Sequence, residues 1–197
     1  HILNLLSDVT LLAAGPALGL SGAATVNGPG ALINQGTLTV NAGTFNAVLD
    51  NQVTGTVNVS GASSFGTASN SGAFTVSGAN SSFGTLSNSG TFTVSGAGGT
   101  NNSTIGTLSA NSGTLNVFAA NGGNATLTVA NGFTNAGTIE LRGLSDENVS
   151  GAAANATLAV TSGGLVNATT GTVRNTENRP VPNARVTVWD DLRVPHQ

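Results

Sequence analysis

Few side chains in this 197-residue sequence could act as an acid, a base or a metal ligand. The chain has eight Asp and Glu residues, five Lys and Arg residues, two His residues and no Cys. No charged residue lies between Asp50 and Glu140, and Asp146 and Glu147 are adjacent, so their side chains are expected to diverge. Glycoside hydrolysis needs two carboxyl groups that flank the scissile bond. We therefore expect no catalytic residue, no metal, no cofactor and no enzymatic activity; a polysaccharide-active β-helix enzyme is the unfavoured alternative.

Two other pairs of polar residues were weighed as sites. Glu140 and Arg142 are two residues apart in a predicted strand, so their side chains share a face. We expect an exposed ion pair there, which contributes little stability. His1 and His196 are the only imidazoles and stand at opposite ends of the sequence, so a metal site built on both is not expected.

The distribution of basic and apolar residues argues against two classes of partner. All five basic residues are Arg at position 142 or later, whereas nucleic-acid binding needs a clustered basic surface. The apolar stretch 9–20 is interrupted by Gly15 and Pro16, and it is shorter than the roughly 20 residues of a membrane-spanning helix. We expect a strand or a cap there, with no membrane span and no nucleic-acid partner.

A five-residue phrase of the form Gly-Thr-Leu-Thr-Val recurs nine times. Its copies begin at residues 36, 55, 72, 90, 113, 125, 137, 156 and 171. Polar and apolar residues alternate in each copy, which is typical of a strand with one buried face. A second strand is expected at residues 65–68, 83–86 and 105–108. The residues expected inside are Leu38/Val40, Val57/Val59, Phe74/Val76, Phe92/Val94, Leu115/Val117, Leu127/Val129, Ile139/Leu141 and Leu158/Val160.

An Asn-x-Gly sequence separates many of these strands, as at Asn34, Asn70, Asn88, Asn111 and Asn135. Asn and Gly tolerate positive φ angles more readily than other residues. We expect these segments to form tight corners between strands.

Stacking of the repeats is the simplest way to bury their apolar residues. A unit of about 18 residues cannot close a core alone, but like residues can stack on like residues in a solenoid. The sequence therefore predicts an all-β parallel β-helix, or β-solenoid, of about nine rungs with 17–24 residues each. The alternative is an antiparallel sandwich. The predicted divisions are an N-terminal apolar strand or cap at 1–21, the β-solenoid at 22–173 and a C-terminal strand or tail at 174–197.

The phrase Asn-x-Gly-Thr-Leu-x-Val resembles the repeats of filamentous-haemagglutinin-type adhesins and autotransporter passenger domains over about residues 22–173. The resemblance implies a secreted, surface-exposed, right-handed β-helix with an adhesive or structural role. Surface glycans or a host or biofilm matrix are the partners that such a role implies.

The C-terminal segment has a different character. Residues 171–188 resemble the opening of carboxypeptidase-regulatory-like domains, without the remainder of such a domain. Residues 184–189 alternate as a strand should, and this strand either caps its own rod or is donated to another subunit. Donation would give a head-to-tail homopolymer. The expected interface residues are Val186, Val188 and Trp189.

Eight Asn-x-Ser/Thr sequons occur, slightly more than this composition gives by chance. Sugar attached there would add solubility to a chain with only 7% charged residues. The sequons in predicted loops, and therefore the candidate N-glycosylation sites, are those at Asn80, Asn102, Asn148 and Asn167.

A file of outward threonines supports a second class of function. Two such files at strand spacing resemble the ice-binding faces of insect antifreeze solenoids, although the second file here is interrupted by Asn, Glu and Arg. Ice binding is therefore the alternative to an adhesive or structural role. The expected first file is Thr37, Thr56, Thr91, Thr114, Thr126, Thr138, Thr157 and Thr172, with Ala73 as its break.

Overall fold

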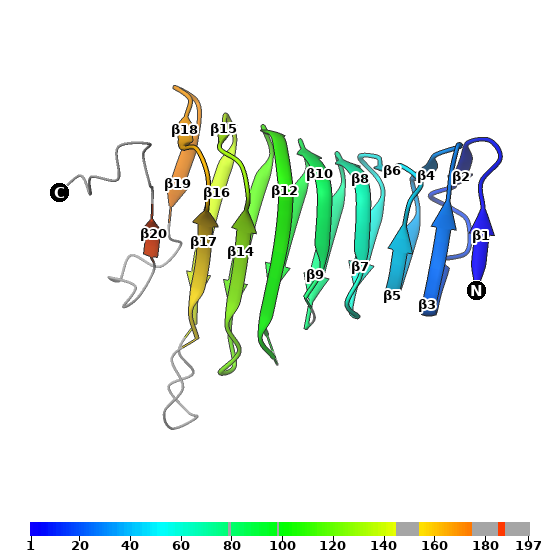
Figure 1. The fold of residues 1–197 in the computed structure, drawn as a ribbon, viewed down its shortest axis with the longest axis horizontal. Coiled ribbons are helices and arrows are strands. Elements are labelled where there is room, and N and C mark those ends of the chain that lie inside the picture. Colours follow the sequence, from blue (N-terminus) through cyan, green and yellow to red (C-terminus); the bar gives the residue numbers. More distant parts are fainter. Residues whose placement is uncertain (79, 98, 145–153, 175–184, 188–197) are drawn as a thin grey trace.

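The computed structural model describes residues 1–78, 80–97, 99–144 and 154–174, and the backbone of 185–187. These residues form a rod of stacked parallel strands with no helix among them (Figure 1). The chain coils around the rod axis and visits three sheet faces in each turn. The predicted all-β solenoid fold is confirmed.

Each face is a ladder of parallel strands in register. Face A contains the first parts of β3 (Leu18–Asn27) and β5 (Thr37–Phe45), then β7 (Thr56–Val59), β9 (Ala73–Ser77), β11 (Thr91–Ser95), β13 (Thr114–Ala119), β16 (Thr138–Gly143) and β19 (Thr172–Arg174). Face B contains β1 (Ile2–Asn4), the second parts of β3 and β5, the first parts of β8 (Ser64–Asn70), β10 (Ser82–Asn88) and β12 (Asn101–Asn111), then β14 (Ala125–Val129), β17 (Ala156–Val160) and β20 (Arg185–Thr187). Face C contains β2 (Val9–Leu11), β4 (Leu32–Asn34), β6 (Leu49–Asn51), the second parts of β8, β10 and β12, then β15 (Phe133–Asn135) and β18 (Leu165–Asn167).

The nine phrases do not correspond to nine rungs. Seven of them lie on face A, but those that begin at residues 125 and 156 form β14 and β17 on face B. The same alternation serves both faces because both bury their apolar side chains in one core. The number of turns is therefore smaller than the predicted nine.

The core is a continuous apolar column inside the three faces. Every residue predicted to point inward from a phrase is at most 5% exposed. Phenylalanines stack through the middle of the column: the ring centroids of Phe45 and Phe65 are 4.8 Å apart, as are those of Phe65 and Phe83. Phe74 meets Phe83 edge-on at 5.5 Å. Such pairs add stability beyond the area that they bury.

The predicted second strands are confirmed as parts of longer ones. Residues 65–68, 83–86 and 105–108 lie in β8, β10 and β12, which pass from face B to face C. The passage occurs near Gly66, Gly84 and Gly106. A Cβ atom on Gly84 would lie 2.5 Å from the carbonyl oxygen of Gly66, so a side chain does not fit there.

The Asn-x-Gly segments are not positive-φ corners, contrary to the prediction. None of their Asn or Gly residues has a positive φ. The glycines are required by space, because a Cβ on Gly90 would lie 2.2 Å from the carbonyl oxygen of Gly72 on the preceding coil. The asparagines are buried, and their amide groups bond to each other along the rod.

This asparagine ladder joins seven coils at the end of each face C strand. Each amide Nδ2 donates to the Oδ1 of the next asparagine at 2.6–2.8 Å. Each Nδ2 also donates to a backbone carbonyl, as from Asn88 to Thr114 at 3.0 Å. The ladder thus satisfies polar side chains that are otherwise costly to bury. Its members are Asn34, Asn51, Asn70, Asn88, Asn111, Asn135 and Asn167.

The first 21 residues form a coil of the same rod. β1 pairs in parallel with β3, and β2 pairs with β4. Large apolar side chains are exposed on this coil, among them Ile2 at 71% and Leu6 at 85%. Within the described residues, no helix is long and apolar enough to span a membrane.

β20 continues face B at the other end, where Val186 is the register partner of Leu158 on β17. The strand expected at residues 184–189 therefore pairs with its own rod over 185–187. Val188 and Trp189, the other two predicted interface residues, lie outside the described residues, as does the candidate glycosylation site Asn148.

Candidate functional site

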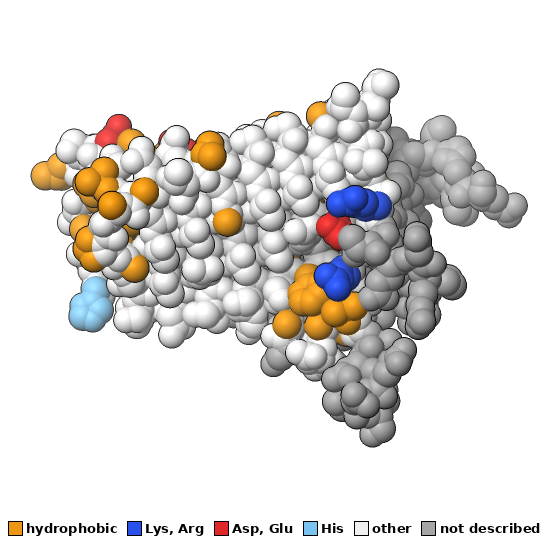
Figure 2. Space-filling model, turned by 180° about the vertical axis from the view of Figure 1, so that it is seen from behind, with side chains coloured by type: hydrophobic (Ala, Val, Ile, Leu, Met, Phe, Trp, Pro, Cys, Tyr) orange, Lys and Arg blue, Asp and Glu red, His pale blue; other side chains and the backbone are white. Residues whose placement is uncertain are grey.

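Three of the five charged residues in the described part of the chain gather near one end of face A. Glu140 and Arg142 lie on β16, and Arg174 lies on β19, the next coil. Figure 2 shows them as red and blue side chains beside an apolar patch. The other two described charges, Asp8 and Asp50, lie on early coils. The electric field of the described rod is therefore concentrated at this end.

The predicted Glu140–Arg142 ion pair does not form. Glu140 instead contacts Arg174, with 3.9 Å between Oε2 and Nη2. The Arg142 guanidinium lies 5.5 Å from the centre of the Phe118 ring. Residues two apart in a strand are separated by roughly 7 Å, whereas register neighbours on adjacent strands are about 4.8 Å apart, so the contacts form between coils.

A pocket of about 230 Å³ opens among these side chains. Three successive coils build it, because Thr93, Asn116 and Glu140 are register neighbours on β11, β13 and β16. Phe118 and Arg142 form a second row beside them, also in register. The pocket thus combines a carboxylate, an amide, a hydroxyl, a guanidinium and an aromatic ring.

The side-chain amide of Asn116 is only half satisfied. Its Nδ2 lies 3.4 Å from the Thr93 hydroxyl, toward the preceding coil. Its Oδ1 is buried and has no hydrogen-bond partner among the described residues. A buried acceptor without a donor costs about 1–3 kcal/mol. The neighbour on the next coil is the Glu140 carboxylate, which is a second acceptor.

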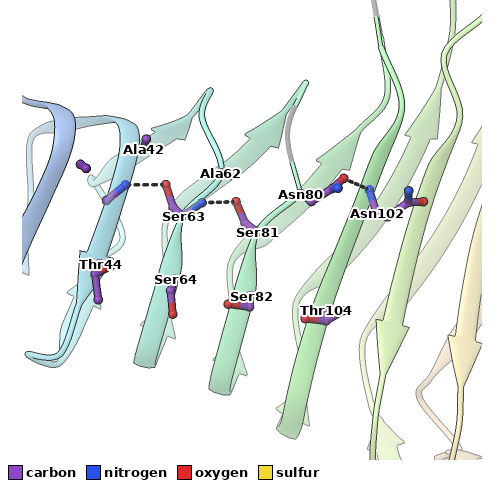
Figure 3. Close-up of a pocket in the computed structure, with 12 residues that line it drawn as sticks. Ala42, Thr44, Ala62, Ser63, Ser64, Asn80, Ser81, Ser82, Asn102 and Thr104 are labelled. Carbon is purple, nitrogen blue, oxygen red and sulfur yellow. Dashed lines mark hydrogen bonds between the residues drawn. The ribbon is translucent and has the colours of Figure 1, made fainter.

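Two wider and shallower troughs run along the rod and carry no charge. One, of about 510 Å³, follows the corner between faces A and B (Figure 3). Three serines support it from below: the backbone N–H groups of Gly43, Ser63 and Ser81 donate to the hydroxyls of Ser63, Ser81 and Ser103. The other trough, of about 440 Å³, follows the glycines at the corner between faces B and C. Both offer hydroxyl and backbone groups but no titratable group.

The expected file of eight threonines is divided between two faces. Thr126 and Thr157 lie on face B, because β14 and β17 belong to that ladder. Face A keeps Thr37, Thr56, Thr91, Thr114, Thr138 and Thr172, with Ala73 between the second and third. Face B has its own file of hydroxyls that the sequence did not reveal: Thr25, Thr44, Ser64, Ser82, Thr104 and Thr128.

The candidate glycosylation residues differ in their surroundings. Asn80 and Asn102 are exposed, and the Asn80 Oδ1 accepts a hydrogen bond from the Asn102 backbone at 2.8 Å. Asn167 ends the asparagine ladder: its Oδ1 accepts from Asn135 and its Nδ2 donates to the Gly171 carbonyl. Attachment of a sugar at Asn167 would occupy the nitrogen that makes this last bond. Whether any sequon is modified stays a prediction.

The described part of the chain contains no group of three His, Asp or Glu side chains that could hold a metal ion. The adjacent acids Asp146 and Glu147 lie outside the described residues. No family model, curated protein or solved structure matches the chain.

Sequence reasoning missed the pocket because its residues are about 24 positions apart. Asn116 was assigned to an outward file and Phe118 was not singled out. Only the register between β13 and β16 brings them beside Glu140 and Arg142. The signal that could have found it was the alignment of the phrases at 113 and 137, which places these residues in matching positions.

Proposed function

We propose that the protein is a secreted structural or adhesive rod of the cell surface, without catalytic activity. The observation that carries this proposal is a continuous, hydrogen-bonded core beneath a surface with no charged residue from 51 to 139. A column of stacked side chains and an asparagine ladder make a rigid spacer. The long neutral faces offer many hydroxyl and amide groups to a matrix or a glycan.

Beads coated with chitin, cellulose or mucin test this function. The purified chain is expected to stay bound to at least one coating without releasing soluble sugar. Release of sugar that increases with time would show an enzyme instead. Failure to bind any of the coatings, together with failure to form filaments, would remove both the adhesive and the structural role.

We further propose that the rods assemble end to end into a homopolymer. β1 and β2 pair with one neighbour each, and the coil that they form exposes Ile2, Leu6 and Leu12. β1 and β20 stand at opposite ends of the same face B ladder. The outer edge of β1 can therefore pair in parallel with the corresponding edge of a second copy, which gives an open filament.

Ice binding by face A is the second candidate function. Six threonines occupy one outward file of this face, and Thr39, Thr75 and Thr93 stand in the next file. Purified protein with this function should lower the freezing point below the melting point, and Thr91→Tyr in the middle of the face should abolish the effect. Absence of thermal hysteresis at high protein concentration would eliminate this candidate.

A further inference from the structure

The pocket on face A lacks a hydrogen-bond donor between two acceptors. The Asn116 amide directs its nitrogen to Thr93, so its Oδ1 faces away from that coil. The register neighbour on the other side is Glu140, whose side chain is only 17% exposed. The one described cation that contacts this carboxylate is Arg174, at the long distance of 3.9 Å. A bound group with two donors would satisfy both acceptors.

The other wall of the pocket favours an uncharged ring with an apolar edge. Phe118 and Arg142 lie side by side there and present an aromatic edge and a planar guanidinium. A guanidinium donates hydrogen bonds in a fixed geometry and repels a second cation, which disfavours an ammonium ligand. At about 230 Å³ the pocket is smaller than the roughly 300–1,000 Å³ of sites for drug-sized ligands, so it suits one small ring.

We propose that this pocket binds a single pyranose unit of a glycan. Two adjacent sugar hydroxyls donate to the Asn116 Oδ1 and to the Glu140 carboxylate, and a ring or hydroxyl oxygen accepts from Arg142. The C–H face of the sugar packs against Phe118. The inference rests on the proposed adhesive function, and it places a specific glycan contact at the charged end of an otherwise neutral rod.

The test uses methyl glycosides of glucose, galactose, mannose and N-acetylglucosamine with the isotope-labelled full chain. We expect at least one glycoside to shift the NMR signals of Asn116, Phe118 and Glu140 with millimolar affinity. Asn116→Leu and Glu140→Gln should each weaken that binding at least tenfold. Asn58→Leu is the matched control, because Asn58 is exposed in the same outward file on β7, and it should bind as the wild type does.

A second measurement separates a ligand contact from an unsatisfied group with no role. Asn116→Leu removes the buried acceptor, so the free variant should be at least as heat-stable as the wild type while it loses the sugar. Binding that is unchanged in this variant, or no signal change with any of the four glycosides, would overturn the proposal. In either case retention on coated beads and filament formation would still test the wider adhesive and structural function independently.

Discussion

At the scale of single residues, the asparagine ladder shows how a solenoid can bury polar side chains without a stability cost. Every internal member is both a donor and an acceptor, so the chain of bonds is complete until the ladder ends. At its start, the Oδ1 of Asn34 has no partner among the described residues because Leu11 occupies the matching position on the preceding coil. The sequence showed the recurrence of Asn but not its burial, because a turn asparagine and a ladder asparagine look the same in one dimension.

Removal of one internal ladder residue should destabilise the rod. Asn88→Ala takes the donor from the Asn111 Oδ1 and leaves a gap beside Asn70. We expect a loss of about 1–3 kcal/mol in the free energy of unfolding, the cost of an unsatisfied buried group. Urea denaturation followed by circular dichroism measures it. Asn58→Ala, at an exposed position, should change stability by less than about 0.5 kcal/mol, and an equal loss in both variants would show that the ladder has no special role.

The glycines of the Asn-x-Gly segments should be intolerant of any side chain. In Gly90→Ala the new methyl would lie 2.2 Å from the Gly72 carbonyl oxygen, so two coils must separate. We expect a loss of about 3 kcal/mol, the upper part of the usual range for overpacking. Gly19→Ala is the control, since no atom lies within 4 Å of its Cβ position. Thermal melting curves that coincide for the two variants would contradict the close approach.

At the scale of strands, the alternation of each phrase was enough to predict which side chains enter the core. It was not enough to predict the face, because faces A and B bury the same pattern in the same column. The spacing held the missing information: the phrase at 125 follows that at 113 by 12 residues, which is too short for a coil of 17–24. Two phrases that close together must lie on different faces of one turn.

The stacked phenylalanines should be the most sensitive part of the core. Phe83 packs face to face with Phe65 and edge to face with Phe74 and Phe92. Phe83→Ala should lower the free energy of unfolding by about 3–5 kcal/mol. Phe83→Leu keeps much of the volume and should cost clearly less. If the two substitutions give the same melting temperature, packing at this position does not limit stability.

At the scale of the whole molecule, the rod was predictable from the repeats, but its charged end was not. The repeats supply the coils, and the register between coils then decides which distant side chains meet. Glu140 was expected to pair with Arg142 in its own strand and meets Arg174 across 34 residues of sequence instead. Spacing within a strand therefore gave a wrong partner, whereas alignment of whole phrases would have given the right one.

End-to-end assembly should depend on the apolar first coil. Ile2→Lys and Leu6→Lys place a charge on the exposed edge without a core contact, so they should prevent filament formation while the monomer stays folded. Val53→Lys is the matched control, because Val53 is 78% exposed in the turn between β6 and β7. Sedimentation velocity at increasing concentration distinguishes monomer from polymer. A wild-type chain that remains monomeric at high concentration would refute assembly.

The central claim, that this is a structural or adhesive rod at the cell surface, is tested most directly by immunogold electron microscopy of intact cells that make the protein. Antibodies are raised against the exposed face A coils of residues 37–94. The account predicts gold label on unpermeabilised cells, at the outer surface or on material that extends from it. Label that appears only after the cells are permeabilised would contradict the account.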